Sequence, residues 1–150
     1  MRTMRTVATG LALALGMVAG ATRLEAQSAN MPFTVIVNEN NPVNEFTREE
    51  LSRMFLKKVT TWRTKRPVMP VDLKEGIKPR ELFTRTIHRR EVTSVASYWQ
   101  QQIFAGRAVP PSQRASDADV MSYVAGNPDA IGYVASGTTL AAGVKVVAVR

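Results

Sequence analysis

Hydrophobic positions along the chain fall into short continuous runs and longer repeats at helical spacing. The first run, Phe33 to Val37, consists of aromatic and β-branched residues, which favour a strand covered on both faces. Asparagines and a proline dominate the next segment, Asn38 to Val43, and these residues are typical of a sharp turn. We therefore expect a strand in the middle of a sheet, ended by a polar turn.

A helix start follows this turn. Thr47 and Glu50 have the spacing of a capping box, in which each residue accepts a hydrogen bond from the other's backbone. The box predicts a helix that begins at Arg48. Residues that recur at helical spacing and should form its buried face are Leu51, Met54, Phe55 and Val59, with Trp62 just beyond.

The same pattern is repeated in the next stretch. Val68 to Val71 predicts a second strand, and Pro79 suits the first turn of a helix, where no backbone donor is needed. Because open α/β sheets place ligands at the carboxyl ends of their strands, we expect the ends of these first two strands to open onto one shared hollow. The predicted buried face of this helix is Leu82, Phe83 and Ile87.

The second half of the chain predicts two helices and two strands. A helix is expected over Glu91 to Phe104, an exposed loop over 105–115, and a helix capped by Ser116. The predicted buried positions of these helices are Val92, Val95, Ala96, Trp99 and Ile103 in the first and Val120, Met121 and Val124 in the second. Gly126 is expected just past the helix end. Strands are expected at Ala130 to Val134 and at Val144 to Val149, so the whole pattern indicates an α/β fold.

The first residues do not follow this pattern. Arg2 and Arg5 precede an uncharged stretch that is rich in Ala and Gly, and Ala26 is a small residue suited to cleavage. We interpret 1–26 as a secretory signal peptide and 27–150 as one domain, located in the periplasm or secreted. A retained membrane anchor is the alternative, although a span needs ~20 strongly apolar residues.

Charge and composition exclude several classes of function. The chain carries a net charge of +8, which favours anionic partners, and export argues against nucleic acid. It contains no cysteine, so neither disulfides nor thiol chemistry are available. Metal-ligand spacings and catalytic or nucleotide-binding motifs are absent from the sequence. We expect no cofactor and no enzymatic activity.

Three blocks of sequence resemble the periplasmic phosphate-binding proteins of ABC importers. The blocks are Val35 to Asn38 with Asn41 to Val43, Thr47 to Phe55 together with Trp62, and Asn127 to Val134. The third is the most specific, because Gly132 in the middle of an apolar strand is hard to explain by strand composition. The resemblance is to one lobe of the two-lobed type II binding-protein fold, in its short single-lobe form. It implies a three-layer lobe with a mixed sheet of about four or five strands and helices on both faces.

The resemblance fails at the residues that hold phosphate in that family, which are an Arg and a Ser-Gly-Thr segment. Leu73 stands at the position of the Arg, and Ile77, Lys78 and Pro79 stand at the positions of the Ser-Gly-Thr segment. A leucine cannot pair with an oxyanion, and a proline lacks the backbone donor. The phosphate cradle is therefore not carried over to this chain.

Other polar residues near the strand ends are candidates for ligand binding. They are Asn38, Asn41, Lys74, Lys78 and Arg80. The alternative is that the asparagines only form the turn and that the basic residues belong to a solvated loop. His88, the single histidine, lies between basic residues and is interpreted as a surface residue.

Three hypotheses of function follow. The first is an exported solute-binding-like domain that takes a small phosphate-like anion and works with an ABC permease or another envelope protein, with a homodimer or partner supplying the missing wall. The second is an envelope interaction module that keeps the fold and binds no small ligand. The third is a hydrolase of anionic envelope material, which requires a carboxylate pair or a carboxylate beside His88 in a cleft.

Overall fold

The structure is a computed structural model that describes residues 31–150. The predicted signal peptide, 1–26, lies outside the described residues. Within 31–150, none of the helices combines the length and apolarity that a bilayer-spanning segment needs.

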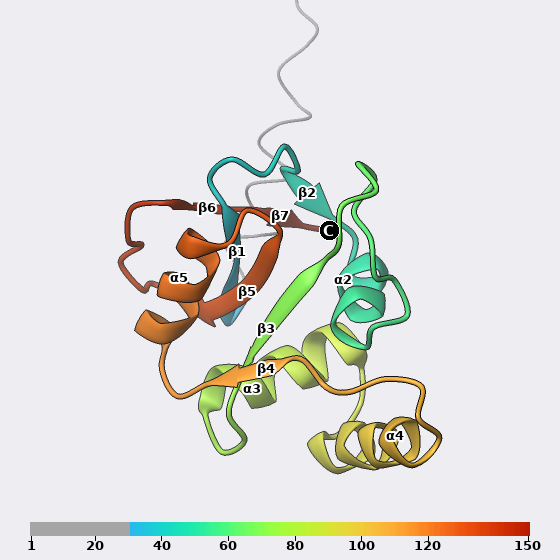
Figure 1. The fold of residues 1–150 in the computed structure, drawn as a ribbon. Coiled ribbons are helices and arrows are strands. Elements are labelled where there is room, and N and C mark those ends of the chain that lie inside the picture. The colour runs from blue at the N-terminus through green and yellow to red at the C-terminus, as the bar shows by residue number, and fades with distance from the viewer. Residues whose placement is uncertain (1–30) are drawn as a thin grey trace, which may run out of the picture.

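Strands and helices alternate along most of the described chain (Figure 1). The strands are β1 (Phe33–Asn38), β2 (Glu45–Phe46), β3 (Met69–Leu73), β4 (Ser112–Arg114), β5 (Ala130–Ala135), β6 (Val144–Val146) and β7 (Ala148–Val149). The helices are α2 (Arg48–Phe55), α3 (Lys78–Phe83), the π-helix η1 (Thr84–His88), α4 (Val92–Phe104) and α5 (Asp117–Gly126).

A five-stranded mixed sheet in the order β4-β3-β5-β1-β6 forms the centre of the fold. β1 pairs with β5 and β6, antiparallel to both, which confirms that the first strand lies inside the sheet. β3 runs parallel to β5 and to β4. Consequently β1 and β3 run in opposite directions, so their two carboxyl ends are at opposite ends of the strands in the sheet.

Helices cover both faces of this sheet, as the alternation along β5 shows. A Cβ atom added at Gly132 would meet Val120 and Val124 of α5. The next side chain, Tyr133, points to the other face. There its ring stacks on Phe83 of α3 with centroids 4.0 Å apart, and lies 5.8 Å from the ring of Phe55 of α2. The predicted three-layer α/β lobe is confirmed.

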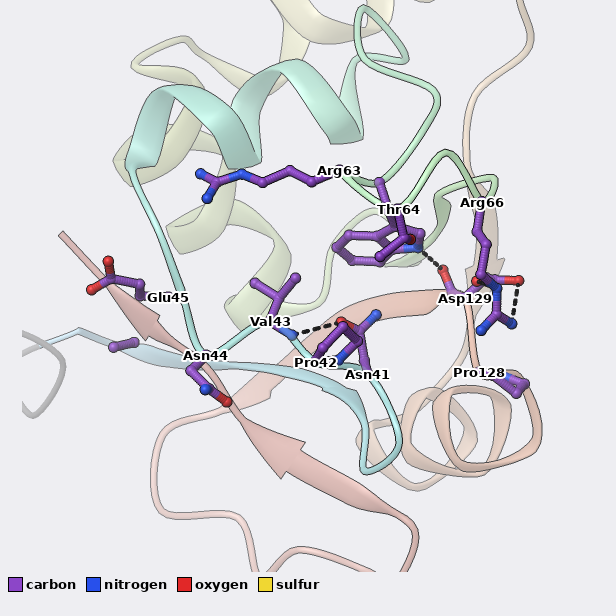
Figure 2. A pocket seen from close by; sticks show the side chains of 12 residues that line it. Asn41, Pro42, Val43, Asn44, Glu45, Arg63, Thr64, Arg66, Pro128 and Asp129 are labelled. Atoms are coloured by element: carbon purple, nitrogen blue, oxygen red, sulfur yellow. Dashed lines mark hydrogen bonds and ion pairs between the residues drawn. The ribbon is translucent and has the colours of Figure 1, made fainter.

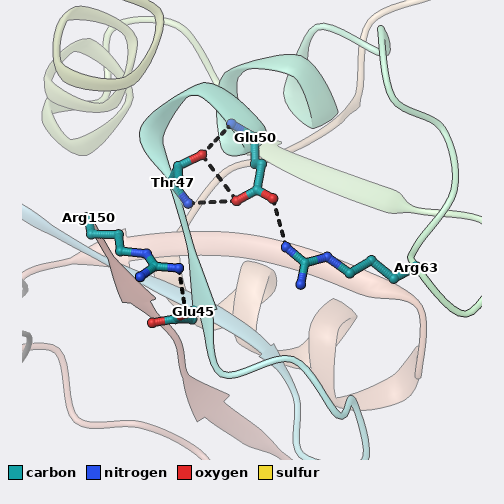
Figure 3. A network of polar contacts seen from close by, with 5 residues as sticks. All are labelled: Glu45, Thr47, Glu50, Arg63 and Arg150. Carbon is teal, nitrogen blue, oxygen red and sulfur yellow. Dashed lines mark hydrogen bonds and ion pairs between the residues drawn. The ribbon is translucent and has the colours of Figure 1, made fainter. Parts of the chain in front are cut away.

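The start of α2 follows its sequence signature (Figure 3). The Glu50 amide donates to Thr47 Oγ1 at 3.1 Å, and the Thr47 amide donates to Glu50 Oε2 at 2.8 Å. These are the two bonds of a capping box. The Thr47 backbone N–H, together with the Arg63 guanidinium at 2.9 Å, holds the pKa of Glu50 below its ordinary value. The predicted helix start at Arg48 is confirmed.

Two predicted helix details are wrong. α2 ends at Phe55, so Val59 lies beyond the helix, although it packs against the core. Gly126 is the last residue of α5 rather than the residue after it, and Asn127 takes the C-cap position with an extended backbone (φ −132°). The side-chain Nδ2 of Asn127 donates to the Tyr123 carbonyl at 2.7 Å, so it satisfies the helix end without a left-handed glycine.

The segment predicted as a loop, 105–115, contains β4, which pairs with β3 in parallel. β4 is an edge strand, and its residues Ser112 to Arg114 are polar and mostly exposed. The pattern of hydrophobic residues therefore did not predict this strand. The predicted last strand, Val144 to Val149, is divided into β6 and β7. β7 leaves the main sheet and pairs with β2. In α4, Val95 and Trp99 are buried, whereas Ile103 is 51% exposed.

We predict that Gly132→Ala destabilises the fold. The added Cβ would lie 2.7 Å from Val120 Cγ1 and 2.8 Å from Val71 Cγ1, so α5 must shift away from the sheet. Overpacking of this kind costs about 1–3 kcal/mol in the free energy of unfolding, which urea denaturation measures. The matched control is Gly126→Ala, where a Cβ meets nothing within 4 Å and stability should be unchanged or slightly higher. Equal midpoints for the two variants would contradict the prediction.

Candidate functional site

The five candidate ligand residues lie in two groups, at opposite ends of the strands of the sheet. Asn38 and Asn41 lie at the carboxyl end of β1. Lys74, Lys78 and Arg80 follow the carboxyl end of β3, which is at the opposite end of the strands. The expectation of one shared hollow at the ends of the first two strands is therefore wrong. Anion binding by any of these residues stays a prediction.

The buried side chain of Asn38 is hydrogen-bonded to the backbone. Its Nδ2 donates to the carbonyl oxygens of Val124 at 3.0 Å and Ala125 at 2.9 Å, in the last turn of α5. Its Oδ1 accepts from the Asn40 amide at 3.0 Å. Both amide hydrogens of this buried side chain are thus used to join the β1 turn to α5.

Arg80 points inward from α3. It is 5% exposed, forms an ion pair with Asp72 of β3, and its Nη1 donates to the Leu73 carbonyl at 2.9 Å. The Tyr133 hydroxyl donates to the other oxygen of Asp72. Arg80 Nε has no hydrogen-bond partner among the described residues. The guanidinium of this candidate residue is therefore neutralised inside the protein.

The buried network shifts the protonation of its members. Burial raises the pKa of Asp72, while the Arg80 charge and the Tyr133 hydrogen bond oppose this rise. Burial and the neighbouring Asp72 carboxylate raise the pKa of Tyr133, so the hydroxyl stays protonated and donates. Sequence reasoning missed Asp72 and Tyr133. The available signal was an acidic residue between the apolar Val71 and Leu73, followed by an arginine in the first turn of the next helix.

The two lysines of the cluster stay at the surface. Lys74 is exposed, and its side chain forms no hydrogen bond or ion pair with the described residues. Lys78 is 72% exposed, with Nζ 3.8 Å from Glu81 Oε2. The structure therefore separates Arg80 from these two residues of the predicted cluster.

His88 is partly buried, which corrects its interpretation as a simple surface residue. Its Nδ1 lies 2.9 Å from Ser52 Oγ, and its ring packs edge-on against Phe83 at a centroid distance of 5.5 Å. Burial, together with the charges of Arg80 and Arg90, lowers the pKa of His88 to about 4. None of its contacts within 31–150 is with a carboxylate. A serine and a histidine thus meet, but this histidine is a weak base and lacks the carboxylate that the hydrolase hypothesis requires.

A pocket with a volume of about 720 Å³ lies beside Asn41, after the carboxyl end of β1 (Figure 2). Its lining residues are Asn41, Pro42, Val43, Asn44, Glu45, Trp62, Arg63, Thr64, Arg66, Pro128, Asp129 and Ala148. Asn41 Oδ1 accepts from the Val43 amide at 3.0 Å, and its Nδ2 has no hydrogen bond within the described part of the chain. Asn41 thus lines this pocket and keeps a side-chain donor available.

Charges around this pocket are balanced. Arg66 binds Asp129 through two contacts, Nε to Oδ1 at 2.9 Å and Nη2 to Oδ2 at 3.0 Å. Arg63 pairs with Glu50. Glu45 pairs with Arg150 at 2.6 Å. Because each cation here has a carboxylate partner, the pocket offers an oxyanion little net attraction. Residues 31–150 also hold no group of three or more His, Cys, Asp or Glu that could bind a metal.

We predict that Asp72→Ala destabilises the protein strongly. Loss of one partner leaves the Arg80 guanidinium buried without its counter-ion, which costs about 3–5 kcal/mol. The double variant Asp72→Ala with Arg80→Met removes both charges and should recover a large part of this loss in urea denaturation. A double variant no more stable than Asp72→Ala alone would show that the ion pair is not the cause.

We also predict that acid destabilises the protein through His88. Its folded pKa of about 4 lies below the unfolded value of 6.5, so the unfolded chain binds more protons between these pH values. The stability from neutral His88 is complete above pH 6.5 and falls by about 3 kcal/mol as the pH drops to 4. His88→Asn keeps an acceptor near Ser52 and cannot titrate. Its unfolding free energy should change less than that of the wild type over this window, and parallel pH profiles would refute the assignment.

Comparisons with known proteins agree with this geometry. The sequence profile of the PBP superfamily domain, the domain of periplasmic binding proteins, matches residues 19–149. Comparison with curated protein sequences finds no significant match.

Solved structures share the fold. A candidate phosphate ABC transporter substrate-binding protein of Clostridium perfringens with bound phosphate is 22% identical, with a TM-score of 0.63, over 79% of this chain and 44% of that one. An ABC-type phosphate transport receptor of Vibrio cholerae is 21% identical, with a TM-score of 0.63, over 79% of this chain and 46% of that one. PstS of Borrelia burgdorferi is 13% identical, with a TM-score of 0.61, over 79% of this chain and 47% of that one.

The present chain spans less than half the length of each of these proteins, and at these identities the likeness concerns the fold. Both the matched profile and the mixed sheet point to the same architecture. The chain therefore belongs to the PBP superfamily and has the fold of one lobe of a phosphate-type binding protein.

Proposed function

We propose that this chain is an exported, non-enzymatic binding-protein domain that works as an envelope interaction module and does not retain phosphate by itself. The observation that carries this proposal is the internal ion pair between Arg80 and Asp72. Arg80 is the only cation of the predicted cluster that is buried, and its charge is already matched by a carboxylate.

The surroundings of Arg80 support this reading. An incoming oxyanion would have to displace Asp72, which also accepts bonds from the Tyr133 hydroxyl and the Leu73 amide. A displaced Asp72 would be a buried carboxylate without its cation, and this state is strongly unfavourable. The adjoining Pro79 supplies no backbone donor. Competition from the protein's own carboxylate thus opposes tight anion binding.

Weak binding of a small oxyanion at Lys74 and Lys78 is the second candidate function. It is favoured by the position of both lysines at the carboxyl end of β3, where open α/β sheets place ligands. In this case a permease, another envelope protein or a second copy of the chain would supply the missing wall of the site.

Calorimetric titration of the purified protein with phosphate and sulfate at low salt separates the two candidates. Under the interaction-module proposal, neither anion gives saturable heat. Saturable heat that Lys74→Ala with Lys78→Ala abolishes would overturn that proposal in favour of an oxyanion receptor. The control pair Lys58→Ala with Lys65→Ala removes two exposed cations elsewhere, and it should have no effect on specific binding. An equal loss in both pairs would indicate only nonspecific charge attraction.

A further inference from the structure

Helix α4 has an unusual composition for a helix at the surface. Its 13 residues include no charged side chain. Only Val95 and Trp99 are fully buried, in a small cluster with Leu56. The exposed positions carry uncharged polar or apolar side chains, namely Thr93, Ser94, Ser97, Gln100, Gln101, Ile103 and Phe104. Removing such a face from water requires no desolvation of an ion.

Large apolar side chains extend from the carboxyl end of this helix. Phe104 is 92% exposed, Val109 61% and Ile103 51%. All three lie within seven consecutive positions of the chain. Figure 1 shows α4 at the outside of the molecule, beyond the helices that cover the sheet. An aromatic ring in this position is available to a neighbouring surface without any rearrangement of the fold.

Cations stand at both ends of the uncharged face. Arg89 and Arg90 are exposed before α4, and Arg107 is exposed after it. Glu91, the acidic residue directly before α4 in the sequence, has its Oε2 3.4 Å from Arg85 Nη2. From Val92 to Ser116 the sequence contains no acidic residue. The surface around α4 is thus uncharged in its middle and positive at its borders.

We propose that the outward face of α4 docks on an anionic lipid bilayer, with Phe104 entering the interface and the arginines facing the lipid phosphates. This inference rests on the proposed interaction function and names the partner. Exposed aromatic side chains beside cations are the features that bind anionic membrane surfaces. A second copy of the chain fits this face less well. A twofold contact over α4 brings the Arg107 end of one copy against a positive end of the other, whether the helices are parallel or antiparallel.

Cosedimentation with vesicles tests the proposal, using the protein as it is recovered from cells after export. Vesicles of equal parts phosphatidylglycerol and phosphatidylcholine should bind the protein, and added salt should weaken the binding. Phe104→Ala should lower the partition coefficient about tenfold, because it removes the large apolar side chain that enters the membrane interface on binding. Arg107→Gln should lower it less and reduce its salt dependence. The control Met69→Ala changes a partly exposed apolar residue on β3 and should bind as the wild type does.

Several outcomes would overturn the inference. They are absence of binding to the anionic vesicles, equal binding to pure phosphatidylcholine vesicles, and equal partition of Phe104→Ala and wild type. A dimer in analytical ultracentrifugation that Phe104→Ala dissociates would assign the face to self-association instead. Because Phe104 is exposed, its loss should leave the circular dichroism and unfolding midpoint unchanged. If the protein binds neither the vesicles nor the oxyanions, the membrane inference is wrong and the interaction-module proposal still holds. If an oxyanion gives saturable heat, the interaction-module proposal is wrong whatever the vesicle experiment shows.

Discussion

Close contact between α5 and the sheet depends on the missing side chain at Gly132. The Val120, Val124 and Val71 side chains fill the space where a Cβ would be. On the opposite face of the same strand, the ring of Tyr133 reaches Phe83 and holds α3 in place. Two neighbouring residues of β5 therefore fix the distance of a helix layer on each side of the sheet. This constraint explains why a glycine lies inside a strand whose other residues are apolar or aromatic.

The hydroxyl of Tyr133 connects this packing to the charged interior. It donates to Asp72, which in turn neutralises Arg80, so β5, β3 and α3 are joined by one polar network below the aromatic stack. A buried network of this kind favours one arrangement of its elements, since any shift leaves a charge unmatched. Arg80, a candidate ligand residue at the start of α3, is thus held in the core by this network.

Most of the fold was predictable because its signals are local. The β-branched run of β1 and the capping box of Thr47 and Glu50 depend on adjacent residues, so they specify their elements without tertiary information. β4 was missed because its three polar residues become a strand only through pairing with β3. The partners of the candidate site depend on contacts between distant residues. No local pattern shows that Asn38 reaches the end of α5 or that Asp72 receives Arg80.

α4 belongs to a different level of stability from the rest of the molecule. It rests on Leu56 through Val95 and Trp99, a cluster separate from the main core, and it adds the Tyr98 hydroxyl bond to the Leu56 carbonyl at 2.9 Å. Few buried apolar contacts and an exposed backbone are the properties of a segment that opens locally while the remainder stays folded. We therefore expect this helix to open and exchange its amide hydrogens faster than the strands of the sheet do.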